Sequence, residues 1–145
     1  MPSGVGLSVA VEEFVWPVRV YYEDTDAGGV VYYANYLKFM ERARTEWLRA
    51  LGFEQDQLRR DEGVVFAVCQ IAVDYMKPAR FNQSLTVSVR LTKLNSASLY
   101  LEHTLVNEVG EAICQGNVKI ACLDIDSFRP KPIPKSILAG LRDAN

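Results

Sequence analysis

The amino-acid sequence predicts an α+β domain in which an antiparallel sheet of about five strands wraps around one long helix. One stretch, residues 34–51, has the three- and four-residue spacing of apolar side chains that marks an amphipathic helix. Most of the remaining chain alternates apolar and polar residues, which is the period of a half-buried strand. A length of 145 residues, with 49% hydrophobic and 23% charged residues, suits a single globular domain.

The first strand is predicted from Phe14 to Tyr22, where apolar side chains occupy every second position from Trp16 onward. Residues 1–13 have no clean period and are interpreted as a loose lead-in. Residues 14–145 then form the single domain, because no linker, internal repeat or change of composition divides them.

The long helix follows at residues 34–51. Its apolar stripe consists of Tyr36, Met40, Ala43, Trp47 and Leu51. Gly52 comes next, where a glycine commonly ends a helix. A stripe with two large aromatic residues needs a broad apolar partner, and a sheet supplies one.

The rest of the chain is predicted to be mostly strand. Residues 64–75 are apolar on both faces, which favours a buried central strand. Alternation predicts further strands at 85–92, 99–105 and 114–122, with turns at 95–96 and 107–110. The proline-rich stretch 129–134 cannot join a ladder and leads into a short helix at 135–141.

Composition excludes several classes of function. Sixteen basic and eighteen acidic residues give a net charge of −2, which disfavours a nucleic-acid partner. The longest apolar runs are too short for a membrane span, and the first residues do not resemble a secretory signal, so we expect a cytoplasmic protein. Cys69, Cys114 and Cys122 lack the spacing of a zinc site or a disulfide framework. They are predicted to be reduced core residues.

Common catalytic motifs are also missing from the sequence. It has no phosphate-binding loop, dinucleotide fingerprint, metalloprotease motif or nucleophile elbow. The single histidine, His103, lies on the apolar side of its predicted strand, which favours a core position over catalysis.

The strongest local signal surrounds Asp26, which is followed by Gly28, Gly29 and the start of the helix. Glycines let the backbone turn and approach a ligand closely, and the first N–H groups of a helix can stabilise an oxyanion. A carboxylate beside such donors suits attack on a thioester, with Asp26 as nucleophile or as general base. A plain acidic turn would show the same residues. A hard-cation site made of Glu23, Asp24 and Asp26 is disfavoured, because the adjacent Glu23 and Asp24 would point apart on a strand end and no further ligand is placed.

The segment that contains this signal resembles a known family. It reads VYYEDTDAGGVVY from Val20, and the helix continues with ERARTE from Glu41. These residues closely resemble the hotdog-fold acyl-CoA thioesterases, within the Tol–Pal system-associated acyl-CoA thioesterase branch of the 4-hydroxybenzoyl-CoA thioesterase family. The resemblance extends over roughly residues 16–138.

The resemblance implies the hotdog fold, a curled antiparallel sheet around one long central helix. It also implies hydrolysis of acyl-CoA, and of acyl carrier protein thioesters, with coenzyme A as part of the substrate and no separate cofactor or metal. By position, Asp26 is the catalytic carboxylate and the Tyr33 backbone N–H is the donor to the thioester carbonyl. Tyr33 stands where many relatives have histidine, so a side-chain role of that histidine is absent. Glu41 is the rival carboxylate, because related enzymes use a helix glutamate.

Family sites lie between two subunits, which implies a homodimer or homotetramer. The predicted substrate-binding residues are Gly28, Gly29, Val30, Tyr32, Tyr36, Lys77 and Arg80. The aromatic members would equally suit plain core, and the two basic residues would equally suit solvent. A non-catalytic module that binds acyl-CoA or a partner remains the alternative function. A hotdog dehydratase is disfavoured, because the motif loop contains no histidine.

Overall fold

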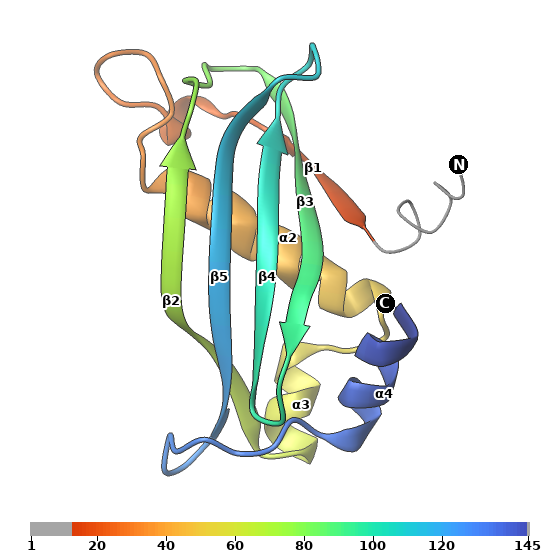
Figure 1. The fold of residues 1–145 in the computed structure, drawn as a ribbon. Coiled ribbons are helices and arrows are strands. Elements are labelled where there is room, and N and C mark those ends of the chain that lie inside the picture. Colours follow the sequence, from red (N-terminus) through yellow and green to blue (C-terminus); the bar gives the residue numbers. More distant parts are fainter. Residues whose placement is uncertain (1–12, 145) are drawn as a thin grey trace.

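The computed structural model describes residues 13–144, so the predicted lead-in at 1–13 lies outside the described residues except for its last position. The elements in chain order are the strand β1 (Phe14–Arg19), the 3₁₀ helix η1 (Tyr22–Asp24), the helices α2 (Asn35–Ala50) and α3 (Gln55–Asp61), the strands β2 (Val64–Tyr75), β3 (Ser84–Leu94), β4 (Ser98–Val106) and β5 (Ala112–Asp124), and the helix α4 (Lys135–Ala144) (Figure 1).

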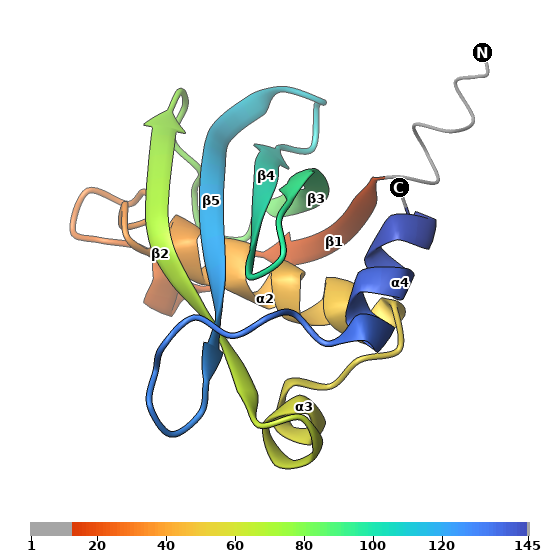
Figure 2. The ribbon, with the colours of Figure 1, turned by 60° about the horizontal axis from the view of Figure 1, so that its bottom comes forward.

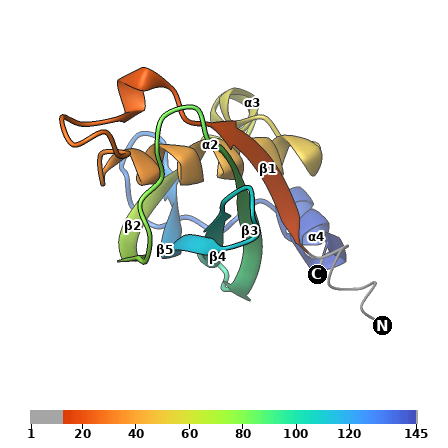
Figure 3. The same cartoon turned by 90° about the horizontal axis from the view of Figure 1, so that it is seen from above.

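In this part of the chain the strands form one five-stranded antiparallel sheet in the order β1-β3-β4-β5-β2. Register shifts at Val68/Gln70 in β2 and at Leu91/Lys93 in β3 mark bulges, which increase the local twist of a strand. The sheet curves around α2, as Figure 3 shows from above. The predicted hotdog fold is therefore confirmed.

The core lies between α2 and the concave face of the sheet. The buried face of α2 includes Phe39 and Met40, each 0% exposed. On β5, Gly116 faces Met40 so closely that a Cβ there would lie 2.8 Å from the Met40 sulfur. The missing side chain thus lets the sheet approach the helix. Gly52, at φ 96°, follows the last turn of α2 as predicted.

The structure corrects the position of β2. Its residues were predicted to form a central strand, but β2 pairs only with β5 and lies at the edge of the sheet. Val68 is 47% exposed and Ile71 is 39% exposed. Some apolar side chains of β2 contact the core. The others, such as Val68 and Ile71, are exposed at the edge of the sheet, where no element of the described chain covers them.

Smaller differences concern the ends of elements. β1 stops at Arg19, and the predicted strand residue Tyr22 instead begins η1. Cys69 is exposed at the β2 bulge, whereas Cys114 and Cys122 are buried as predicted. Burial raises the pKa of each of these two buried thiols to about 11.

Two short helices lie at one end of the sheet (Figure 2). The sequence did not predict α3, in which only Leu58 is buried. The predicted C-terminal helix is confirmed as α4, and it contributes Ile137 and Leu141 to the core. Within residues 13–144, no helix is long and apolar enough to cross a membrane.

Candidate functional site

The loop between η1 and α2 is a closed turn that presents Asp26. The Asp26 N–H donates to the Val30 carbonyl at 2.9 Å, and the Gly29 N–H donates back to the Asp26 carbonyl at 3.0 Å. The Gly28 N–H donates to Asp26 Oδ1 at 2.8 Å. A Cβ on Gly28 would lie 3.2 Å from that oxygen, and Gly29 has φ +80°. The backbone at Gly29 therefore favours glycine, and a side chain at Gly28 would press on the Asp26 carboxylate. The exposed carboxylate keeps Oδ2 without a partner among the described residues.

Asp24 fixes this loop to the start of α2. It is 5% exposed, and its Oδ2 accepts the Tyr21 N–H at 2.8 Å. Its Oδ1 accepts a hydrogen bond from the side-chain amide of Asn35, the first residue of α2, at 3.0 Å. Its backbone carbonyl accepts the Tyr32 N–H at 2.9 Å. One buried carboxylate thus holds both flanks of the turn that carries Asp26.

Replacing Asp24 by Ala is expected to reduce the free energy of unfolding by about 1–3 kcal/mol, because two donors lose a charged acceptor. Hydrogen exchange of the amides in residues 21–35 should accelerate more than that of the sheet. Urea unfolding and exchange measurements test both effects. Glu23→Ala is the matched control, since Glu23 is the exposed neighbour, and it should change neither quantity. Equal effects of the two substitutions would contradict the anchoring role.

The N-terminus of α2 leaves a backbone donor open. Within the described chain, the Tyr33 N–H has no acceptor, while the Tyr33 carbonyl accepts the Tyr75 hydroxyl at 3.0 Å. The N-cap residue, Ala34, has no side chain that can cap the helix. Free N–H groups at this end carry the positive end of the helix dipole, so they favour a developing negative charge.

A cavity of about 270 Å³ lies between the start of α2 and the end of β2. Its lining residues are Val31, Tyr33, Tyr36, Tyr75, Met76, Lys77 and Pro78. The Tyr36 hydroxyl accepts the Ala79 N–H at 3.0 Å. Burial raises the pKa of Tyr36 above its usual range, and the negative charge of Asp26 adds to the increase. The structure therefore brings Asp26, Tyr33 and Tyr36 to one end of the helix.

The other predicted substrate-binding residues surround this end. Val30 pairs with Arg80 in an isolated bridge, and the Tyr32 ring lies 4.8 Å from that of Tyr33. The Lys77 ammonium forms a salt bridge with Glu111. The Arg80 guanidinium has no side-chain partner among the described residues, so it is the freer of the two predicted cations.

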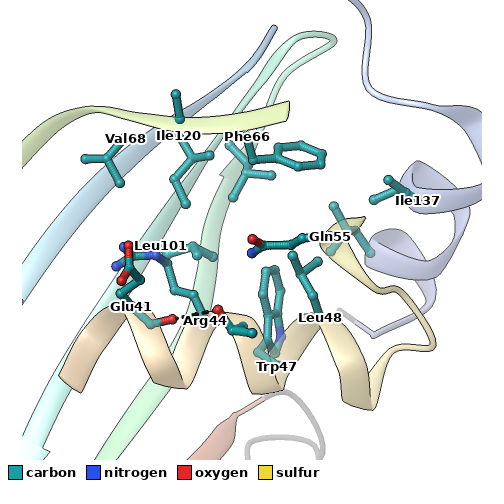
Figure 4. Close-up of a pocket in the computed structure, with 14 residues that line it drawn as sticks. Glu41, Arg44, Trp47, Leu48, Gln55, Phe66, Val68, Leu101, Ile120 and Ile137 are labelled. Carbon is teal, nitrogen blue, oxygen red and sulfur yellow. Dashed lines mark hydrogen bonds between the residues drawn. The ribbon is translucent and has the colours of Figure 1, made fainter. Parts of the chain in front are cut away.

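Glu41 lies elsewhere, on a larger cavity of about 570 Å³ between α2 and the sheet (Figure 4). The lining includes Glu41 and Arg44 from α2, Phe66, Val68, Leu101 and Ile120 from the sheet, Gln55 from α3, and Ile137 from α4. In residues 13–144, the exposed Glu41 carboxylate forms no salt bridge. Glu41 thus lines the larger cavity, whereas Asp26 lies in the loop before α2 and lines neither of the two cavities.

The sequence did not single out Arg44, which is 9% exposed and contacts His103. Arg44 Nη1 lies 3.1 Å from His103 Nε2, and His103 Nδ1 lies 3.0 Å from the Ser88 carbonyl oxygen. Because a carbonyl only accepts, Nδ1 carries the proton and Nε2 accepts from Arg44. Burial lowers the pKa of His103 to about 4, so its ring is neutral at pH 7. The available signal was an arginine within the apolar stripe of the helix.

The described residues contain no group of three or more His, Cys, Asp or Glu side chains suited to hold a metal ion. Glu23, Asp24 and Asp26, which were weighed as cation ligands, therefore do not form such a group. The carboxylate of Asp24 is instead occupied by the two donors that fix the loop.

The model of the thioesterase-like superfamily matches residues 20–141. The chain is 44% identical over 129 residues to the acyl-CoA thioester hydrolase YbgC of Escherichia coli O6:H1, and the match covers 89% of this chain and 96% of that protein. It is 42% identical over 127 residues to the acyl-CoA thioesterase YbgC of Haemophilus influenzae, covering 88% and 93%. A crystal structure of a probable thioesterase from Bartonella henselae superposes with a TM-score of 0.80 at 32% identity, covering 84% of this chain and 99% of that one.

Proposed function

The chain belongs to the thioesterase-like superfamily and is a thioester hydrolase, and from this premise we propose that Asp26 drives hydrolysis of acyl-CoA at the N-terminus of α2. The observation that carries the proposal is that two groups have no hydrogen-bond partner among the described residues: one carboxylate oxygen of Asp26 and the backbone N–H of Tyr33. Both belong to the short segment that joins η1 to the helix. Tyr33 and Tyr36 line the cavity there, and Asp26 acts electrostatically on the Tyr36 phenol.

The proposed reaction uses these two groups. The thioester carbonyl oxygen accepts a hydrogen bond from the Tyr33 N–H, and the helix dipole stabilises the negative charge that develops on it. The Asp26 carboxylate either attacks the carbonyl carbon or takes a proton from the attacking water. The carbon–sulfur bond then breaks, the thiolate takes up a proton, and free acid and thiol leave. In the first route, water hydrolyses the anhydride that forms on Asp26.

The test is thiol release from a panel of short-chain, long-chain and aromatic acyl-CoAs. The proposal expects turnover of at least one class by the purified protein. Binding of acyl-CoA without any thiol release would favour a non-catalytic binding module instead.

Acyl carrier protein thioesters present the same bond, and the exposed Arg80 guanidinium offers a partner for the phosphate that both carriers bear. A comparison of kcat/KM for the two carriers tests this second substrate.

We also propose that the working protein is a homodimer or larger, through the edge of β2. The apolar side chains exposed on and just after this strand are Val68, Ile71, Tyr75 and Met76. An unpaired strand edge with exposed apolar residues is a ready template for another chain. Tyr75 and Met76 also line the cavity beside Tyr33, so a partner on this edge would adjoin the proposed site.

Sedimentation of the wild-type protein is therefore expected to give at least twice the mass of one chain. Ile71→Lys should shift the protein toward monomer, because it places a charge on the proposed apolar interface. Thr86→Lys, an exposed change on β3, is the control and should leave the mass unchanged. A monomeric wild type, or an oligomer that Ile71→Lys leaves intact, would contradict the use of this edge.

A further inference from the structure

The Tyr36 hydroxyl is a buried donor that the described chain leaves unused. Tyr36 is 3% exposed, and its oxygen accepts the Ala79 N–H at 3.0 Å. The proton of the same hydroxyl has no acceptor among the described residues. A buried donor without an acceptor is costly, and native structures rarely keep one without a reason. The unused proton therefore indicates an acceptor that the chain itself does not supply.

Tyr36 differs in this from the other polar side chains that line the cavity at the start of α2. The Tyr75 hydroxyl already donates to the Tyr33 carbonyl, and the Lys77 ammonium is paired with Glu111. The Tyr33 side chain is 62% exposed, so water can satisfy its hydroxyl. Among the described residues that line this cavity, Tyr36 is the one that combines burial with an unused donor.

The phenol of Tyr36 is held in place by the fold itself. Its ring makes edge contacts with the rings of Phe39 and Tyr75, at centroid distances of 6.2 and 5.6 Å. Ala79, which donates to the phenol oxygen, also accepts the Val31 N–H through its carbonyl at 2.8 Å. The hydrogen bond from Ala79 polarises the phenol and makes its O–H a stronger donor. Tyr36 is therefore a preorganised donor of the kind that stabilises developing negative charge.

Two further observations connect this hydroxyl to the Asp26 loop. Tyr33, whose backbone N–H also lacks an acceptor in the described chain, lines the same cavity as Tyr36. Burial raises the pKa of Tyr36, and the negative charge of Asp26 adds to the increase, so the phenol keeps its proton at neutral pH. A carboxylate, a backbone donor and a protonated phenol thus act on one region.

Resting on the proposed function, we propose that the Tyr36 hydroxyl is a second donor to the thioester carbonyl oxygen, beside the Tyr33 N–H. When the Asp26 carboxylate or a water molecule adds to the carbonyl carbon, an electron pair of the C=O bond moves onto this oxygen. Both hydrogen bonds strengthen as the charge grows, and the phenol keeps its proton. When the intermediate collapses, the electron pair re-forms the C=O bond and the thiolate leaves. The carbonyl oxygen is the favoured acceptor, because sulfur accepts hydrogen bonds only weakly.

Tyr36→Phe is expected to lower kcat for acyl-CoA hydrolysis by about 10²- to 10³-fold, with KM changed by less than about threefold. A donor to the oxyanion acts in the transition state, so its loss falls on kcat, whereas a merely structural role would not produce this split. Urea unfolding shows whether the variant is folded, since the Ala79 N–H loses its acceptor. Tyr100→Phe is the matched control. It removes the same group from β4, outside this cavity, and should keep kcat within about twofold of wild type.

Infrared spectroscopy tests the contact without turnover and without deletion of the hydroxyl. Asp26→Asn is loaded with an acyl-CoA that carries an isotope label in its carbonyl group, and the carbonyl stretch is compared with that of free acyl-CoA. The two donors should lower the stretching frequency. A fluorinated tyrosine at position 36, protonated at the pH of the measurement, should lower it further, because it is a stronger donor of nearly the same shape. This measurement serves if Tyr36→Phe does not fold.

Four results would each overturn the assignment of Tyr36: an unchanged kcat in folded Tyr36→Phe, a rise in KM alone, an equal loss in Tyr100→Phe, or a carbonyl stretch that the fluorinated tyrosine leaves unchanged. Any of them, together with thiol release by the wild type that Asp26→Asn abolishes, would leave the proposed function standing. No thiol release by the wild type from any acyl-CoA would defeat the proposed function. The carbonyl stretch of bound acyl-CoA would then still decide whether the Tyr36 hydroxyl contacts the thioester.

Discussion

Asp26→Asn is expected to lower kcat for acyl-CoA hydrolysis by about 10²- to 10⁴-fold while the protein stays folded. Asparagine is neutral, so it neither attacks a thioester nor takes a proton from water at neutral pH. It retains an oxygen that can accept the Gly28 N–H, which now donates to Asp26 Oδ1. The shape of the turn should therefore survive, and the loss should fall on the chemical step with little change in KM.

Glu23→Gln is the matched control for this substitution. Glu23 is exposed in η1, three residues before Asp26. Its replacement by Gln removes the same charge from the same region of the chain. Its kcat should remain within about twofold of wild type, because the charge of an exposed surface group is screened by water and salt. Comparable losses in both variants would indicate a general electrostatic effect on substrate binding instead of a catalytic carboxylate.

The second large effect concerns pH and stability. The pKa of His103 is about 4 in the folded protein, mainly because burial disfavours the charged ring, against 6.5 when the ring is exposed. Above pH 6.5 the ring is neutral in both states. As the pH falls from 6.5 to 4, the unfolded chain takes up a proton that the folded chain does not. The free energy of unfolding should fall by about 3 kcal/mol over this range.

Urea unfolding at several pH values measures this loss. His103→Gln cannot titrate, so its stability should change less between pH 6.5 and 4, although the variant itself is less stable at pH 7. Neighbours lower the pKa of Glu111 and of Asp124, mainly by hydrogen bonds from Lys77 and Ser127 respectively. Both groups also cost stability in acid, but they titrate in both proteins. Parallel pH profiles for wild type and His103→Gln would contradict a neutral, buried His103.

The sequence predicted the fold well where its signals are local. The period of α2, the alternation of β3, β4 and β5, and the turns between them depend on neighbouring residues. The edge position of β2 was missed because an apolar face looks the same whether this chain or another covers it. The helix α3 was missed because only Leu58 of its seven residues is buried, which leaves no apolar stripe to detect.

The residues of the candidate site were likewise predictable only where they lie close together in the sequence. Asp26, Gly28 and Tyr33 lie within eight successive residues, so their spacing alone indicated a carboxylate beside a helix start. Arg44 and His103 are 59 residues apart, and only the packing of α2 on β4 brings them together. The larger cavity likewise depends on side chains from both short helices and three strands, a combination that no local pattern reveals.

The central claim is tested most directly by measuring thiol release from the best acyl-CoA of the panel. Wild type, Asp26→Asn and Glu41→Gln are assayed together. Each variant is first shown to be folded and to have the same mass in solution as the wild-type protein. We predict that Asp26→Asn loses about 10²- to 10⁴-fold in kcat while Glu41→Gln stays within about tenfold of wild type. The opposite order, with Asp26→Asn active and Glu41→Gln silent, would contradict the account and place the reaction in the cavity beside Arg44.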